Sequence, residues 1–81
     1  MLANKVLMIT GGTGSFGNTV LNRFLRTDVR EIVIFSRDEK KQEDMRIALR
    51  SPKVRFCIGD VRDYTNIAAA MRGVDYVFHA A

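Results

Sequence analysis

A chain of 81 residues has room for one small domain, and its 47% hydrophobic and 27% charged residues are typical of a globular protein, not a disordered one. The single cysteine, Cys57, excludes an internal disulfide and fits a reducing cytoplasm, and no apolar run reaches the roughly 18 residues that a membrane helix needs. The net charge of +4 would suit a nucleic-acid binder, but the basic residues are interspersed with acidic ones and lack aromatic neighbours that stack on bases. We therefore expect neither a nucleic-acid nor a membrane partner.

The most informative stretch is residues 6–17, in which an apolar, strand-forming run stops at a cluster of glycines and an amphipathic helical pattern begins. Gly12, Gly14 and Gly17 have the spacing G-x-G-x-x-G of dinucleotide-binding loops, and Gly11 starts an overlapping G-x-x-G-x-x-G pattern. A glycine-rich turn between a strand and a helix also arises without any ligand, so the spacing alone leaves both interpretations open. No Gly-Lys-Ser/Thr closes the turn, which argues against a P-loop.

Each part of this loop has a predicted role. An early glycine permits a sharp turn, the next lets the main chain approach a pyrophosphate, and Gly17 lets the helix pack closely on the strand. The pyrophosphate would then face the free N–H groups at the start of the helix. The hydroxyls of Thr13 and Ser15 supply further donors, and Phe16 opens the amphipathic pattern of a helix over residues 15–26.

The end of the second predicted strand, Glu31–Ser36, indicates which dinucleotide the loop would hold. Many NAD-binding units place an acidic residue there, where it bonds the ribose hydroxyls. This sequence has Ser36 and Arg37 instead, with Lys40 close behind, and such donors and cations suit the 2′-phosphate of NADP. Asp38 complicates this interpretation, because it is an acidic residue two positions after the strand end. Its alternative role is to cap the next helix. We predict NADP over NAD, against the alternative that these are ordinary surface charges.

The following segment predicts a helix over residues 38–49 and a strand over residues 53–58, whose partly alternating pattern suggests a place near the sheet edge. Asp60 and Val61 come directly after this strand. In a nucleotide-binding sheet, an aspartate here can accept a hydrogen bond from the adenine amino group, and the valine can offer a main-chain contact and an apolar surface. The alternative for Asp60 is an ordinary turn residue or helix cap.

The last segment predicts a helix closed by Gly73 and a fourth strand over residues 75–81. The small side chains of Ala80 and Ala81 would leave room for a ligand beside the glycine loop, or else would serve tight packing. His79 has no second residue of the metal-ligating kind near it, so we predict no metal site.

The alternation of strands and helices is typical of an α/β fold with a parallel sheet and right-handed crossovers. The expected strand order is 3-2-1-4, the N-terminal half of a Rossmann fold, with a crevice where the fourth strand crosses to the other side of the first. We interpret residues 1–81 as a partial NADP-binding Rossmann domain that lacks the later strands and the substrate domain. An unprotected apolar edge at the fourth strand would favour self-association, so we expect a homo-oligomer or marginal stability.

Four segments of the sequence resemble the extended short-chain dehydrogenases, and more closely the bacterial UDP-N-acetylglucosamine 4,6-dehydratases of capsule, O-antigen and flagellin-sugar biosynthesis. They are residues 10–17, 35–42, 58–63 and 73–81, and together they make the likeness cover nearly the whole chain. The Ser-Arg-Asp-Glu-Lys-Lys-Gln stretch within residues 35–42 is the most specific to this branch.

The resemblance implies a role for each group of candidate residues. The glycines would line the pyrophosphate, the basic strand end would receive the 2′-phosphate, two residues after the third strand would contact adenine, and the fourth strand would form a wall beside the cofactor. These residues are Gly11, Gly14 and Gly17, then Ser36, Arg37 and Lys40, then Asp60 and Val61, and finally Ala80 and Ala81.

The reaction implied by the resemblance is an internal redox dehydration of a UDP-sugar. The cofactor takes hydride from C4, water leaves across C5 and C6, and hydride returns to C6, with inversion at C5 in some members. The family's tyrosine–lysine pair lies after the fourth strand, so we predict no catalytic residue here and expect the 81-residue chain alone to be inactive. The alternatives are an NAD(P)-dependent nucleotide-sugar epimerase or reductase, and a non-catalytic nucleotide-binding module.

Overall fold

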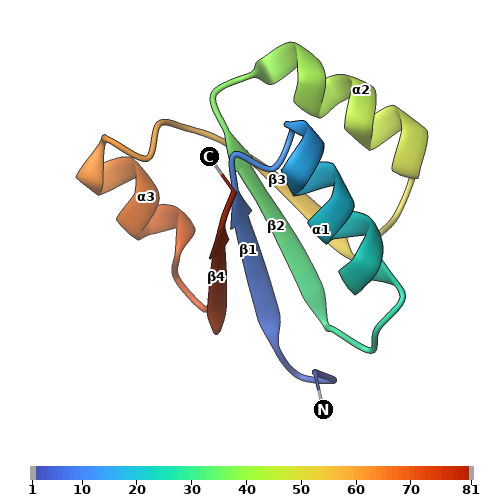
Figure 1. Ribbon diagram of the computed structural model, residues 1–81. Coiled ribbons are helices and arrows are strands. Elements are labelled where there is room, and N and C mark those ends of the chain that lie inside the picture. The colour runs from blue at the N-terminus through green and yellow to red at the C-terminus, as the bar shows by residue number, and fades with distance from the viewer. Residues whose placement is uncertain (1, 81) are drawn as a thin grey trace.

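The computed structural model describes residues 2–80, and within them four strands alternate with three helices (Figure 1). The elements are β1 (Val6–Thr10), α1 (Ser15–Leu25), β2 (Glu31–Ser36), α2 (Glu39–Leu49), β3 (Val54–Ile58), α3 (Tyr64–Ala70) and β4 (Tyr76–His79). Every predicted element is present. β1 and β2 also have the predicted bounds, because each is a continuous apolar run that polar or glycine residues interrupt at its end.

The four strands form one parallel sheet in the order β3-β2-β1-β4, which confirms the predicted order. β1 lies in the middle and pairs with β2 on one side, where Ile9 is opposite Ile34, and with β4 on the other, where Ile9 is opposite Phe78. The strand order therefore reverses at β1. In doubly wound sheets a crevice forms at this point, beyond the carboxyl ends of the strands.

The helices cover both faces of the sheet, so β1 and β2 are buried on both sides. Figure 1 shows α1 and α2 on one face and α3 on the other. Alternate residues of the two central strands divide between these layers. Leu7, Ile9, Ile32 and Ile34 pack with side chains of α1 and α2, whereas Val6, Met8, Val33 and Phe35 pack with Ile67 and Ala70 of α3. This two-sided core explains why the central strands read as continuous apolar runs.

Phe16 departs from the amphipathic pattern of α1, because it is 56% exposed while Val20 and Leu21 are buried. It belongs to the first turn of the helix. Its ring is tilted against the ring of Phe78 on β4, and the two ring centroids lie 5.7 Å apart. The residue therefore lies at the carboxyl edge of the sheet and not in the core.

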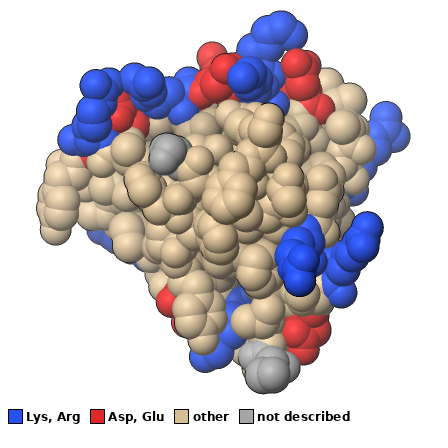
Figure 2. Space-filling model, in the orientation of Figure 1, with Lys and Arg blue, Asp and Glu red and all other residues tan. Residues whose placement is uncertain are grey.

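β4 forms one edge of the sheet and exposes apolar side chains, with Tyr76 52% and Val77 45% exposed. An apolar groove runs beside it, lined by Leu2, Leu7, Phe24, Tyr76, Val77 and Phe78. Figure 2 shows no charged side chain in the middle of the face that it draws. Lysine, arginine and acidic side chains line the upper edge, toward which the carboxyl ends of the strands point in Figure 1, and others lie on the right-hand side and at the bottom.

Candidate functional site

The glycine loop after β1 has a tight geometry at its first and last glycines. Gly11 has a φ of +66°, a left-handed conformation that favours glycine, and its N–H donates to the Phe35 carbonyl at 2.9 Å. A Cβ atom at Gly17 would lie 2.5 Å from the Cα atom of Gly12, so α1 packs directly against the loop. Both positions therefore require glycine for reasons internal to the fold.

Gly14 differs from these two glycines. Its φ is −80°, which any residue adopts, and a Cβ atom there would meet the Gly11 carbonyl oxygen at 3.6 Å, an ordinary contact. The packing of residues 2–80 therefore does not require glycine at this position. The open space at this position is compatible with the close approach of a ligand to the main chain, which is the role predicted for the middle glycine.

The start of α1 is suited to hold an anion. Its N-cap is Gly14, and no side chain of the described residues makes a capping hydrogen bond there. By contrast, the carboxylates of Asp38 and Asp63 cap α2 and α3. The first turn of α1 therefore keeps its N–H donors and its positive dipole end available. The amide of Asn18 holds the loop in place by donating to the carbonyls of Thr13, at 3.4 Å, and Gly14, at 3.2 Å.

The end of β2 presents a buried hydroxyl followed by an exposed cation. Ser36 is buried, and the side chain of Arg37 is 68% exposed. Both residues line a shallow pocket together with Thr13, Asp38 and Glu39. The Asp38 carboxylate accepts a hydrogen bond from the Lys41 N–H at 2.9 Å, so Asp38 takes the helix-capping role that the sequence leaves open.

Of the three candidate residues for the 2′-phosphate, Lys40 lies apart from this pocket. Its ammonium group is 3.3 Å from the Asp44 carboxylate, one turn further along α2. Both side chains are exposed, at 84% and 64% of their surface, so the pair stabilises the fold little. In this arrangement the charge of Lys40 is directed along the helix, and Arg37 is the cation at the strand end.

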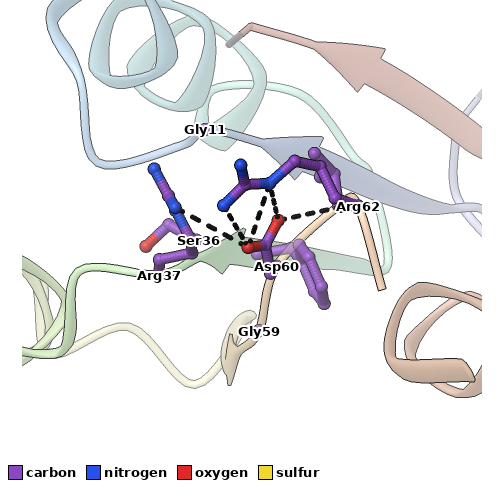
Figure 3. A pocket seen from close by; sticks show the side chains of 8 residues that line it. Gly11, Ser36, Arg37, Gly59, Asp60 and Arg62 are labelled. Atoms are coloured by element: carbon purple, nitrogen blue, oxygen red, sulfur yellow. Dashed lines mark hydrogen bonds and ion pairs between the residues drawn. The ribbon is translucent and has the colours of Figure 1, made fainter. Parts of the chain in front are cut away.

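A second pocket opens between the ends of β2 and β3 and contains an ion cluster. It is lined by Gly11, Phe35, Ser36, Arg37, Gly59, Asp60, Val61 and Arg62. Figure 3 shows the guanidinium groups of Arg37 and Arg62 directed toward the carboxylate of Asp60. Arg62 Nη2 lies 2.9 Å from Asp60 Oδ2, Arg62 Nε lies 3.1 Å from Oδ1, and Arg37 Nη1 lies 3.6 Å from Oδ2. Two cations against one carboxylate give the cluster a net positive charge.

The ion cluster sets the ionisation of Asp60. The hydrogen bonds from the side chain of Arg62, followed by the one from its backbone N–H, lower the pKa of Asp60 from 3.8 to about 2. The same contacts raise the pKa of Arg62. Asp60 is therefore an ionised acceptor throughout the neutral range. An acceptor of this kind suits an amino group such as that of adenine.

The end of β4 lies beside the glycine loop. The Ala80 N–H donates to the Thr10 carbonyl at 2.9 Å, so the predicted wall residue is next to the end of β1. The Thr10 hydroxyl is hydrogen-bonded to Nδ1 of His79. Ala81, which the sequence also assigns to this wall, lies outside the described residues.

Two other features are absent from the described residues. Residues 2–80 contain no group of three or more metal-ligating side chains. None of the helices within these residues has both the length and the apolar character of a membrane span.

The structure therefore brings most of the candidate residues to one edge of the sheet. The two pockets share Ser36 and Arg37, and Gly11 joins the second pocket to the glycine loop. Sequence reasoning gives no role to Arg62, although it lies two residues after Asp60. The signal that could have found it is a cation placed in the turn directly after a strand-end aspartate.

Comparisons with known proteins place the chain in a family. The model of a family described as polysaccharide biosynthesis protein matches residues 7–81. A UDP-glucose 4-epimerase of Rickettsia akari is 71% identical over 85 residues, and one of Rickettsia bellii is 68% identical over 85 residues. Each alignment covers 100% of this chain but 25% of the relative, so the chain spans about a quarter of the length of these curated relatives.

Solved structures agree with the fold. Pen from Bacillus thuringiensis superposes with a TM-score of 0.95 at 35% identity, over 100% of this chain and 26% of that one. WbmF from Bordetella bronchiseptica, solved in complex with NAD+, superposes with a TM-score of 0.76 at 27% identity, over 99% of this chain and 24% of that one. Because the family match covers nearly the whole chain, this protein belongs to the polysaccharide biosynthesis protein family, with the N-terminal half of a Rossmann-like fold.

Proposed function

We propose that this chain binds the adenosine and pyrophosphate groups of NADP, as part of an enzyme that modifies UDP-sugars for surface polysaccharides. One observation carries the proposal. Three features lie together at the carboxyl edge of one parallel sheet. They are the glycine loop with its open space at Gly14, the start of α1, which no described side chain caps, and the cationic pocket around Asp60. Nucleotides bind at this edge, where the strand order reverses, in doubly wound sheets. The structures of WbmF with NAD+, and with NAD+ and UDP, support the same class of ligand.

The residues present fit such a dinucleotide group by group. The first turn of α1 and the open position at Gly14 would receive the pyrophosphate, with the hydroxyls of Thr13 and Ser15 beside it. The Asp60 carboxylate would accept a hydrogen bond from the adenine amino group, and Val61 would contact the ring. Ser36, Arg37 and Lys40 are the proposed ligands of the 2′-phosphate, while Phe16, Gly11, Gly17, Ala80 and Ala81 would complete the walls.

The choice of NADP over NAD rests on the end of β2. Many NAD-binding units use a carboxylate here to bond the two ribose hydroxyls, and the Asp38 carboxylate already has a structural role as the cap of α2. A 2′-phosphate needs donors and positive charge, and Ser36 and the exposed Arg37 supply both. WbmF was solved with NAD+ at 27% identity to this chain, so we assign NADP from this chain's own residues and not from that relative.

Two reactions fit a cofactor site of this kind. The resemblance of residues 35–42 favours the 4,6-dehydration of UDP-N-acetylglucosamine, with or without inversion at C5. The relatives of 71% and 68% identity are named UDP-glucose 4-epimerases, which favours epimerisation at C4 of a UDP-sugar. When bound, the dinucleotide would supply a hydride acceptor and donor in either reaction. The part of this chain is to bind and orient that group, and we expect no turnover from these 81 residues alone.

Calorimetric titration of the chain with NADP and NAD tests the cofactor assignment. We expect NADP to bind at least about tenfold more tightly, because hydrogen bonds to a charged group contribute about 1.5–3 kcal/mol. Equal affinities would contradict the 2′-phosphate site, and no binding of either dinucleotide would contradict the nucleotide role.

The reaction is tested by the product. A polypeptide that carries this chain joined to a C-terminal part like that of its relatives is incubated with UDP-N-acetylglucosamine and with UDP-glucose, and the sugars are identified by NMR. A 4-keto-6-deoxy product supports the dehydratase, and a C4 epimer supports the epimerase. The same assay on the 81-residue chain should give neither product.

A further inference from the structure

Gln42 is a buried polar residue of α2 that the proposed cofactor contacts do not use. It is 1% exposed. Its Nε2 atom lies 2.8 Å from the Cys57 carbonyl oxygen, 3.3 Å from the Ser36 carbonyl oxygen and 3.0 Å from the Ser36 hydroxyl oxygen. Carbonyl oxygens only accept hydrogen bonds, so these two fix the amide with its NH₂ group toward β2 and β3. The NH₂ group has two hydrogens, so one is donated to the Cys57 carbonyl and the other is shared between the two Ser36 oxygens, of which the hydroxyl oxygen is the nearer.

This hydrogen bond determines what the Ser36 hydroxyl can still do. A serine hydroxyl has one hydrogen to donate and two lone pairs that accept. Because Gln42 occupies a lone pair, the hydroxyl acts as an acceptor on its inner side. Its own hydrogen has no acceptor among the hydrogen bonds of residues 2–80. Ser36 lines both pockets at the end of β2, so a ligand bound in them can supply the acceptor for that hydrogen.

The amide of Gln42 is not explained by the filling of space. Its Oε1 atom is buried and has no hydrogen-bond partner within the described residues, which carries a free-energy cost. A methionine or leucine would occupy the same position without that cost. The three contacts of Nε2 are therefore what distinguishes glutamine from an apolar residue here.

We propose that Gln42 is a positioning residue that turns the Ser36 hydroxyl outward as a fixed donor for the 2′-phosphate of the cofactor. The inference rests on the proposed NADP function. A hydroxyl oriented in advance donates to a phosphate oxygen without losing rotational freedom on binding, which strengthens binding. Arg37, the next residue, supplies the positive charge, and Gln42 acts on the ligand through Ser36 only.

The test measures the contribution of the 2′-phosphate alone. The chain is titrated calorimetrically with 2′,5′-ADP, which carries this phosphate, and with 5′-AMP, which lacks it. The variants are Gln42→Met, Ser36→Ala and the double variant, with Glu43→Met as the control at the neighbouring exposed position of α2. Thermal unfolding followed by circular dichroism reports the fold of each variant.

We expect Gln42→Met and Ser36→Ala each to reduce the preference for 2′,5′-ADP by about tenfold, with 5′-AMP affinity unchanged. The double variant should lose no more than Ser36→Ala alone, because both changes remove the same donor. An unchanged preference in Gln42→Met, or an equal loss for both ligands, would overturn the role of Gln42. A wild-type chain without any preference for 2′,5′-ADP would instead overturn the NADP assignment, so the two failures are distinguishable.

A measurement on the wild-type chain covers the case in which Gln42→Met does not fold. When a phosphate oxygen accepts the hydrogen of the Ser36 hydroxyl, the hydroxyl oxygen becomes more negative. The hydrogen bond that this oxygen accepts from the Gln42 amide then becomes stronger. The side-chain NH₂ resonances of Gln42 should therefore shift in a ¹⁵N-resolved NMR spectrum when 2′,5′-ADP is added, but not when 5′-AMP is added. Equal shifts with both ligands, or none with 2′,5′-ADP, would contradict the proposal.

Discussion

Arg62 holds the carboxylate of Asp60 with its side chain and its backbone at once: Nη2 lies 2.9 Å from Oδ2, and the backbone N–H donates to Oδ1, also at 2.9 Å. Arg37 approaches the same carboxylate more loosely, at 3.6 Å. A carboxylate offers about four lone-pair sites, and Arg62 and Arg37 contact both oxygens of Asp60, so an adenine amino group would take the place of one of these contacts. Arg62 is therefore a determinant of the charge and orientation of the proposed adenine acceptor.

The first prediction concerns the titration of this carboxylate. In Arg62→Met the pKa of Asp60 should rise from about 2 toward 3.8, because the hydrogen bonds of the guanidinium are the largest cause of the shift. The folded-state pKa lies below the ordinary value. The stability contributed by the cluster is therefore complete above about pH 4 and is lost as the pH falls toward about 2. Carbon-detected NMR of the Asp60 carboxyl group measures both midpoints.

A control separates this effect from the general loss of a positive charge. Arg72→Met removes an exposed arginine outside the pocket and should leave the Asp60 midpoint where it is. A wild-type midpoint near 3.8 would show that Arg62 does not hold the carboxylate in solution.

The second prediction separates the roles of two glycines. Gly17→Ala forces a Cβ atom to within 2.5 Å of the Gly12 backbone and should lower the free energy of unfolding by about 1–3 kcal/mol, as in overpacked sites. Gly14→Ala meets an ordinary contact at 3.6 Å and should change stability by about 1 kcal/mol at most, the scale of an N-cap change. Its effect should appear as weaker NADP binding instead. Urea denaturation and calorimetric titration measure the two quantities.

The opposite pattern would contradict this assignment of roles. If Gly14→Ala binds NADP as the wild type does, the open space at this position does not serve a ligand. If Gly17→Ala is as stable as the wild type, α1 can move away from the loop without cost.

The features that could be predicted are those that a pattern of residue types displays, whereas the others depend on the conformation of a single turn or helix end. β1 and β2 could be predicted because burial on both faces requires a continuous apolar run, which the sequence displays directly. The role of Arg62 could not be predicted in the same way, because its contact with Asp60 depends on the conformation of the turn after β3. Phe16 matched the helical period, but the first turn of α1 lies at the edge of the sheet, where no core covers it. The nucleotide contacts of the candidate residues stay predictions.

The third prediction addresses Asp38. Asp38→Ala removes the cap of α2 and should lower the free energy of unfolding by about 1 kcal/mol, whereas Asp38→Ser keeps a capping oxygen and should lower it less. Neither variant should alter the ratio of NADP to NAD affinity. A selective loss of NAD binding in Asp38→Ser, with the helix intact by circular dichroism, would show that Asp38 binds ribose hydroxyls instead.

The fourth prediction compares two cations near the end of β2. Arg37→Ala should weaken NADP binding by about tenfold or more and leave NAD binding nearly unchanged, because a charge-assisted contact to the 2′-phosphate is lost. Lys40→Ala should have a smaller effect, since the Lys40 ammonium group is directed toward Asp44. Calorimetric titration of both variants with both dinucleotides tests the pair. If NADP preference survives in Arg37→Ala, the account of this strand end is wrong.

The fifth prediction concerns the exposed edge at β4. Tyr76 and Val77 are 52% and 45% exposed, and an edge strand with apolar side chains is a template for pairing with another chain. The 81-residue chain should therefore sediment as a concentration-dependent mixture of monomers and larger species. Val77→Lys should shift this mixture toward the monomer, because a charged side chain on an edge strand opposes pairing.

Ile47→Lys is the matched control, since Ile47 is 56% exposed but lies on α2. A monomeric wild type with a sharp unfolding transition at high temperature would contradict the prediction, and an equal effect of both substitutions would trace association to general hydrophobicity instead of to β4.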